Sequence, residues 1–280
     1  MPIVTSGSVV MIFKNFVDTH THTINSFDGN YPIEDMCDAA IEKGIKIIAF
    51  TDHVEMDFYT EKGFDKDAEN SYKDILRAKE IYKDRLDICT GIELAQGTYN
   101  KDEAEALLAS RDYDFVIGSI HNLRATEDFC FLKYDGLDID YLLDNYFNEL
   151  KLLADWAKFD TFAHLTYPLR YIVGENKIPV DMTKYQNDID EILSILVSKD
   201  KALEINTSGL RQPIGITMPD ESIVRRFKEL GGKMITVGSD SHFTEHLGAG
   251  IEEGMTIAKN AGFDSVVVFK KRQPVEIEII

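Results

Sequence analysis

The sequence predicts an α/β fold in which parallel strands close into a barrel surrounded by helices. Predicted strands and helices alternate about seven times along the 280 residues, a pattern typical of parallel strands joined by helical crossovers. No low-complexity or Pro/Gly/Ser-rich linker divides the chain. One sheet of seven or eight strands with its helices would use the whole length, which favours a closed barrel over an open sheet. We therefore expect residues 1–280 to form a single domain.

Short apolar runs mark the predicted strands. The first leads from Phe16 into D-T-H-T-H at residues 18–22, and the second is the run I-K-I-I-A-F at residues 45–50. Such runs, bounded by polar or turn residues, are typical of buried strands. We expect the later strands at 86–94, 115–120, 161–163, 202–206, 234–237 and 265–269.

Amphipathic helices are expected between the strands. Between Pro32 and Gly44, apolar residues recur at helical spacing from Ile33 to Ile41. Proline at the start and glycine at the end are common helix boundaries. By the same reasoning we expect helices at 67–85, 101–110, 139–158, around 189–196, around 223–230 and from about 245 to 261.

Composition excludes several classes of partner. The net charge of -19 argues against nucleic acid or an anionic membrane, and an anionic substrate would need local positive charge. The three cysteines have no C-x-x-C spacing, so we expect neither disulfides nor thiolate zinc, and we expect a cytoplasmic protein. Residues 1–14 lack signal-peptide features, and an extra strand or a vector remnant both remain open. The oligomeric state, including a homo-oligomer, is also open.

Six of the seven histidines fall at or just after the carboxyl end of a predicted strand. In α/β barrels this end carries the active site, built from several strands at once. Glu93 ends the third predicted strand, and Asp240 ends the seventh beside His242, whereas His246 falls at a predicted helix start and is interpreted as an ordinary core or rim side chain. The six histidines are His20, His22, His53, His121, His164 and His242.

These side chains predict a metal site with more than one ion. A structural zinc takes about four ligands, and six imidazoles with several carboxylates exceed that number, so we expect two to three divalent ions. Nitrogen and oxygen ligands without sulfur suit zinc, manganese or iron. Glu93 could bridge two ions, and Asp18, Asp28 and Asp52 are further candidates at the same rim.

The order of short motifs resembles the polymerase and histidinol phosphatase (PHP) family. The motifs are D-T-H-T-H, F-T-D-H, G-I-E, G-S-I-H, A-H, E-I-N and G-S-D-S-H, between Asp18 and about Pro274. The runs E-I-N-T-S-G-L-R and V-V-F-K-K-R resemble its histidinol-phosphatase branch. The resemblance implies a distorted (β/α)7 TIM-like barrel with a trinuclear metal centre.

The resemblance also implies which residues hold each ion. The first ion would be held by His20, His22, Glu93 and Asp240. The second would be held by Glu93, as a bridge, with His121 and His164. The third would be held by His53 and His242, with Asp28 where some relatives have a histidine. The carboxylate of Asp28 departs from the family pattern, and it affects which metal the third ion site would prefer.

The implied activity is metal-dependent hydrolysis of L-histidinol phosphate to L-histidinol and phosphate, a step of histidine biosynthesis. Hydroxide formed between the first two metals would attack the phosphate directly, without a phosphoenzyme. Asp240 or His242 would relay a proton to the leaving alkoxide. The small phosphate ester is thus the expected partner, and neither nucleic acid nor membrane is expected.

Candidate substrate residues lie on predicted rim loops. Arg170 and Arg211 could bind phosphate through their planar guanidinium groups, although an exposed surface arginine is the alternative for each. Asn206 belongs to the same motif as Arg211. Residues that could select the alcohol are too many to rank, and they include Asp52, Glu55, Asp57 and Phe58.

Three other functions remain open at this point. A PHP phosphoesterase acting on a nucleotide or phosphotyrosine would share the same metal ligands. A non-catalytic accessory module, as PHP domains can be in polymerases, would have lost ligands, and none is lost here. The sequence of an amidohydrolase barrel also begins with an H-x-H motif, but it typically has a carboxylated lysine where this chain has Glu93.

Overall fold

The computed structural model describes residues 16–279, and its parallel strands form one nearly closed barrel. Along the sheet the order is β1-β2-β4-β5-β6-β7-β8, which confirms the predicted (β/α)7 barrel. Our interpretations of residues 1–14 lie outside the described residues. The strands are β1 (Val17–Thr21), β2 (Ile47–Phe50), β4 (Asp87–Ala95), β5 (Phe115–Ser119), β6 (Thr161–Phe162), β7 (Ala202–Asn206) and β8 (Ile235–Gly238).

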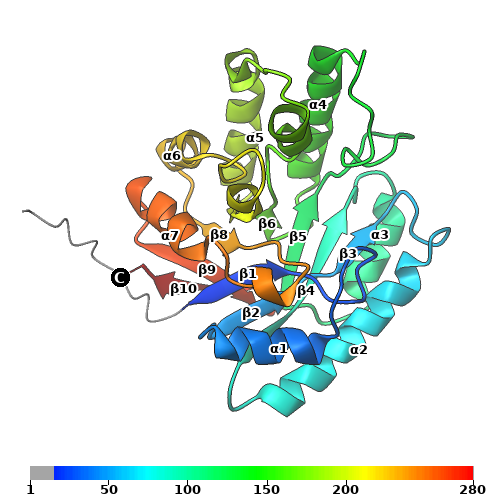
Figure 1. Cartoon of the computed structure of the whole chain (residues 1–280), viewed down its shortest axis with the longest axis vertical. Helices are drawn as coiled ribbons and strands as arrows, with labels where there is room; N and C mark the ends of the chain where they lie inside the picture. Colours follow the sequence, from blue (N-terminus) through cyan, green and yellow to red (C-terminus); the bar gives the residue numbers. More distant parts are fainter. Residues whose placement is uncertain (1–15, 280) are drawn as a thin grey trace, which may run out of the picture.

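Helices surround the strands on the outside (Figure 1). Each buries one face, as in α4, where Leu143, Tyr146 and Leu150 are buried and Tyr141 is exposed. This spacing is why the helices were predictable from sequence. The helices are α1 (Ile33–Glu42), α2 (Phe64–Tyr82), α3 (Lys101–Ala109), α4 (Ile139–Trp156), α5 (Gln186–Ser198), α6 (Glu221–Glu229) and α7 (Ile251–Asn260).

Two helices differ from their predicted bounds. Helix α2 starts and ends three residues earlier than expected, after Gly63 at φ 85°. Helix α7 was expected from about residue 245 but begins at Ile251. A short 3-10 turn occupies Thr244–His246 instead, and Gly248 and Gly250 have φ of 70° and 78°. Left-handed residues interrupt a helix, so the glycines delay its start.

A short strand that we did not predict places His53 beside Glu93. Strand β3 (His53–Glu55) pairs in parallel with β4, and His53 and Glu93 are register partners. Residues 51–52 separate β3 from β2, which pairs with the earlier part of β4. The long strand β4 therefore brings one histidine and one carboxylate to the same level of the barrel.

The seam between β1 and β8 completes the barrel through a few close contacts. Thr21 and Ser241 form a parallel bridge, and the Asp240 amide donates to the His20 carbonyl at 2.8 Å. A Cβ atom on Gly238 would lie 2.3 Å from the Cβ of His20. Only glycine permits this approach, which joins the strands that carry both ends of the predicted metal site.

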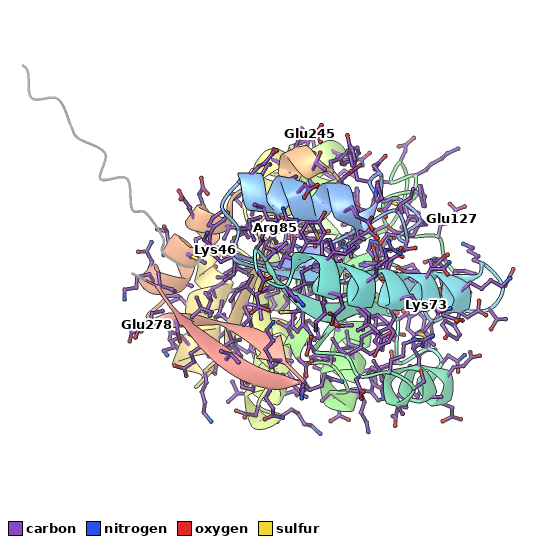
Figure 2. All side chains as sticks on the ribbon, turned by 90° about the horizontal axis from the view of Figure 1, so that it is seen from below. Lys46, Lys73, Arg85, Glu127, Glu245 and Glu278 are labelled. Atoms are coloured by element: carbon purple, nitrogen blue, oxygen red, sulfur yellow. The ribbon has the colours of Figure 1, made fainter. Side chains whose placement is uncertain are left out.

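The last strand predicted from the sequence forms half of a hairpin that is separate from the barrel. Strands β9 (Ser265–Lys270) and β10 (Gln273–Glu278) pair antiparallel in their own sheet. Val267 and Phe269 pack against Phe115 and Ala202 at the amino ends of barrel strands, away from the histidines. Figure 2 shows Glu278 of this hairpin far from Glu245 of the loop after β8. The strand expected at residues 265–269 is therefore present, and it lies outside the barrel sheet.

Candidate metal centre

The predicted histidines meet around the carboxylate of Glu93, which is fully buried. Its Oε2 lies 3.1 Å from His20 Nε2 and 2.9 Å from His53 Nδ1. Its Oε1 lies 3.1 Å from His121 Nε2 and 3.0 Å from His164 Nε2. One carboxylate from β4 thus faces imidazoles that belong to four other segments of the chain.

Asp240 is the second carboxylate of this cluster. Its Oδ1 lies 3.3 Å from His22 Nε2 and 3.9 Å from His20 Nε2. The backbone of Asp240 is left-handed, with φ of 53°, and Asn206 Nδ2 donates to its Oδ2 at 3.2 Å. Asn206 is fully buried and does not line the cavity described below. The substrate contact of Asn206 stays a prediction, and in this structure its side chain holds the carboxylate of Asp240.

Asp28 completes a third group with two histidines. Its Oδ2 lies 3.2 Å from His242 Nε2, and its Oδ1 lies 3.7 Å from His53 Nε2. The two imidazole Nε2 atoms are 3.3 Å apart. The carboxylate that departs from the family pattern therefore lies where the sequence comparison placed it, and its side chain is 43% exposed.

The spacing of these atoms fits divalent ions. Ligand atoms around a tetrahedral zinc, each about 2.0–2.1 Å from the ion, lie roughly 3.3 Å apart. The Nε2 atoms of His121 and His164 are 3.3 Å apart, and each lies close to the same Glu93 oxygen. His22 Nε2 is buried and has no hydrogen-bond partner among the described residues. Buried polar atoms normally have partners, so this nitrogen is poised for an ion.

Side chains outside the cluster fix the orientation of three imidazoles. Each of these side chains forms a hydrogen bond with the Nδ1 atom of one imidazole, so the Nε2 atom of that ring is directed inward. The same arrangement orients metal-binding histidines in general. Glu204 was not among our predicted residues, although it lies in the E-I-N motif, and Glu55 was one of several unranked candidates. The contacts to Nδ1 are Glu204 to His20 (2.6 Å), Glu55 to His121 (2.9 Å) and Ser26 to His22 (3.1 Å).

Asp18 and Asp52, two of the rim candidates, are structural residues. Asp18 is fully buried, and its carboxylate accepts from the Ser239 amide and hydroxyl at 2.9 and 2.6 Å. Asp52 accepts from the Thr23 amide at 2.6 Å and from the Ser26 hydroxyl at 2.9 Å. Both carboxylates are used in fixing loops, and neither lines the cavity over the histidines.

Glu93 and His22 are held in the protonation states that bind metals. For His20, His53 and His121 burial would lower the pKa, but neighbouring carboxylates outweigh burial and raise it, so these imidazoles would release a proton on binding an ion. Burial alone would raise the pKa of Glu93, but the charges of His20, His53 and His121 outweigh burial and hold that pKa well below its usual range. Burial, together with neighbouring imidazoles, lowers the pKa of His22 well below its usual value. An ionised carboxylate and a neutral imidazole are the forms that coordinate metal ions.

A cavity of about 600 Å³, here called the metal cavity, lies over the cluster. Arg211 donates to the carbonyl oxygens of Ser239 and Asp240 at 2.6 and 2.7 Å. Arg170 lies over the ring of Tyr171 at 5.1 Å, and its buried Nε has no partner among the described residues. Residues that line the metal cavity include Asp28, His53, His121, His164, Arg170, Arg211, Asp240, His242 and His246.

His246, interpreted from the sequence as an ordinary core or rim side chain, is a half-buried residue of the metal cavity. It ends the 3-10 turn after β8 and lines the metal cavity, with its ring 5.4 Å from that of Phe243. Burial, followed by the nearby charge of Arg211, lowers its pKa. It belongs to none of the groups of His, Asp and Glu that could hold an ion.

No helix within residues 16–279 combines the length and apolarity needed to cross a membrane.

Comparisons with known proteins agree on one family. A family described as "PHP domain" matches residues 18–208. A probable histidinol-phosphatase of Thermotoga maritima is 31% identical over 91% of this chain and 97% of its own length. A histidinol-phosphatase of Lactococcus lactis is 30% identical over 90% and 94%.

A solved structure has the same architecture. The crystal structure of histidinol phosphate phosphatase from Lactococcus lactis, complexed with zinc, L-histidinol and phosphate, has a TM-score of 0.79 and 26% identity. The match covers 94% of this chain and all of that one. From the motif order, the barrel and these matches, the chain belongs to the PHP family.

Proposed function

We propose that this protein is a metal-dependent phosphomonoesterase that hydrolyses L-histidinol phosphate to L-histidinol and phosphate. The observation that carries the proposal is the shared carboxylate of Glu93, which faces four imidazoles beneath a cavity that also holds two arginines. Relatives named histidinol-phosphatase align over nearly their whole length. A cluster of cations beside arginines suits an anionic ester.

Two to three divalent ions, zinc, manganese or iron, would occupy the three groups. When bound, such ions lower the pKa of water and offset the charge of phosphate oxygens. The first ion would be held by His20, His22, Glu93 and Asp240; the second by Glu93, His121 and His164; the third by Asp28, His53 and His242.

The chain's own residues supply orientation and proton transfer. Arg170 has a free Nε for a phosphate oxygen, and Arg211 holds the backbone of Asp240 while it lines the same cavity. Burial would raise the pKa of Asp240, but His20 and neighbouring imidazoles hold it well below its usual range. Asp240 therefore stays ionised. Because its carboxylate lines the same cavity, it would be placed to relay a proton to the departing alkoxide. His242, on the same loop, is the alternative relay.

The test combines elemental analysis of the purified protein with phosphate release from L-histidinol phosphate before and after chelation. We expect two to three equivalents of metal, phosphate release that chelation abolishes, and recovery when metal is returned. A panel containing nucleoside monophosphates and phosphotyrosine tests the alternative, a PHP phosphoesterase for another ester. Such an enzyme would have the same metal ligands and would differ in the alcohol that it accepts. Metal-replete protein without activity on L-histidinol phosphate would contradict the assignment.

A further inference from the structure

A cavity of about 360 Å³, here called the basal cavity, lies at the end of the barrel opposite the metal centre. Two of its residues, Lys271 and Arg272, form the turn between β9 and β10. Their amides donate to the carboxylate and the carbonyl of Asp114, both at 2.9 Å. Asp114 directly precedes β5, so this turn is held at the amino end of a barrel strand, whereas the histidines follow carboxyl ends. The residues that line the basal cavity are Leu108, Arg111, Asp112, Tyr113, Lys271 and Arg272.

The lining of the basal cavity is positively charged, although the whole chain has a net charge of -19. Asp112 is the one carboxylate in this lining, against three cations. Among the residues that the structure describes, no carboxylate forms an ion pair with Lys271 or Arg111. Arg111 donates to the Ser110 hydroxyl at 3.0 Å and lies 5.9 Å from the ring centroid of Tyr72. These contacts leave its charge uncompensated, so an anion between the two cations would reduce their repulsion.

Arg272, the third cation, is fixed by the protein on one side. Its Nε donates to the carboxylate of Asp160, and its Nη2 donates to the Lys158 carbonyl at 2.9 Å. These bonds use two of its three nitrogens and leave Nη1 for another acceptor. Because a guanidinium group is planar and rigid, the two bonds also set the direction of Nη1, and less freedom is lost when an anion binds.

A buried hydroxyl group in the same lining lacks an acceptor. Tyr113 is 5% exposed, and its hydroxyl forms no hydrogen bond with any described residue. Burial raises the pKa of Tyr113 and outweighs the opposite effect of Arg111, so the hydroxyl keeps its proton. The neighbouring Arg111 has only donors and cannot accept that proton. Buried polar groups normally have partners, and the partner missing here is an acceptor.

We propose that the basal cavity is a binding site for a small phosphate anion. Arg111 and Lys271 supply charge-assisted hydrogen bonds, and the Tyr113 hydroxyl and Nη1 of Arg272 donate to the remaining oxygens. A phosphate has enough oxygens to accept from all four donors at once, and charged donors form its strongest hydrogen bonds. The site is independent of the proposed phosphatase function, because the basal cavity shares no lining residue with the metal cavity.

The test follows the backbone amide signals of isotope-labelled, zinc-loaded protein by NMR during a titration with inorganic phosphate. We expect saturable shifts for Tyr113, Lys271 and Arg272, and sodium chloride at the same ionic strength is the reference for screening. Arg111→Ala and Lys271→Ala should each weaken this binding about tenfold or more, while shifts near the metal centre stay as in the wild type. The matched control is Lys101→Ala, at the other end of α3 and outside the lining, which should bind as the wild type does.

The variant Tyr113→Phe separates binding from folding. It removes a hydroxyl that has no partner in the phosphate-free protein, so we expect an unchanged or higher Tm without phosphate and an affinity that falls several-fold. A lower Tm would show that the hydroxyl already has a partner and would contradict its role.

Three further results would overturn the site. They are the absence of saturable shifts at these amides up to about 10 mM phosphate, the same shifts with chloride, and shifts that persist in both Arg111→Ala and Lys271→Ala. Phosphate that binds only near the metal centre falls under the first result, and it would leave the proposed function intact.

Discussion

A single buried carboxylate, that of Glu204, links two of the proposed metal ligands, which belong to different strands of the barrel. Its Oε1 lies 2.6 Å from His20 Nδ1, and its Oε2 accepts from the His164 backbone amide at 2.9 Å. His164 has an unusual φ of 21°, so this hydrogen bond helps to hold a strained backbone. Because both oxygens of Glu204 serve as acceptors, an amide in its place would set one NH₂ group against a donor.

We therefore expect Glu204→Gln to weaken metal binding about 10- to 100-fold, the usual cost of losing a side chain that orients a ligand. Competition with a chromophoric chelator measures the affinity directly. The matched control is the exposed Glu253→Gln on α7, which should bind metal as the wild type does. Unchanged affinity in a folded Glu204→Gln protein would rule out the positioning role.

The two arginines should differ in their kinetic effects. Arg170→Ala removes a guanidinium with a free Nε, so we expect KM for a phosphomonoester to rise about tenfold or more with a smaller change in kcat. Arg211 also holds the carbonyl of Asp240, so Arg211→Ala should lower kcat as well. Steady-state kinetics on the metal-replete variants separates the two cases. Identical profiles, or wild-type kinetics for both, would remove this distinction.

Residues at strand ends could be predicted from sequence, and the residues that support them could not. His20 and His121 follow apolar runs, and the carboxyl ends of parallel strands meet at one edge. Glu204 lies inside a strand, where sequence does not reveal which buried acceptor faces which ring nitrogen. The meeting of Arg111 with Lys271 gave no signal at all, because it depends on how the turn of the last hairpin lies against the end of α3.

The hairpin of β9 and β10 shows that the pairing of whole strands can also be missed in the sequence. Strand β9 was visible as an apolar run, but its partner β10 is mostly exposed and alternates with charged residues. The turn between them is formed by Lys271 and Arg272, at φ of 50° and 63°, where sequence rules look for glycine or asparagine. Without a turn signal, strand β10 and its pairing with β9 were not predicted.

Arg272 anchors this hairpin to the barrel. Its guanidinium donates to the carboxylate of Asp160, which is 6% exposed, and to the Lys158 carbonyl. We expect Arg272→Ala to lower the free energy of unfolding by about 1–3 kcal/mol, because the buried carboxylate of Asp160 loses its charged partner and keeps only the Val116 amide. Urea unfolding provides the measurement. Lys233→Ala breaks an exposed pair with Asp200 and should cost about 0–1 kcal/mol; equal losses would contradict the anchor.

The proposed metal cluster draws side chains from both sides of the β1–β8 seam. His20 on β1 and Asp240 after β8 both lie near the buried cluster around Glu93, close to Gly238. The alternation of strands and helices predicted this architecture because each crossover buries one apolar face. It did not predict the seam, which depends on one close approach between distant residues. The single-domain organisation of residues 1–280 remains a prediction.

Removal of metal should therefore loosen the whole molecule. Ions that bind only the folded state add their binding free energy to its stability, so we expect chelation to lower Tm by at least several degrees and added metal to restore it. Calorimetry of the same sample before chelation, after chelation and after reloading measures the effect. A Tm that does not respond to chelation, in protein shown by elemental analysis to have lost its metal, would contradict it.

The histidines of the metal centre and the residues Phe27, Asp128 and Phe131, which also line the metal cavity, come from different parts of the chain. The former sit at the ends of strands, while the latter sit on connecting loops that the barrel merely supports. Under our proposals, these loops could change during evolution so that the enzyme accepts a different phosphate ester, while the residues of the metal centre stay the same. Reaction and choice of substrate would then be free to evolve at different rates within one polypeptide.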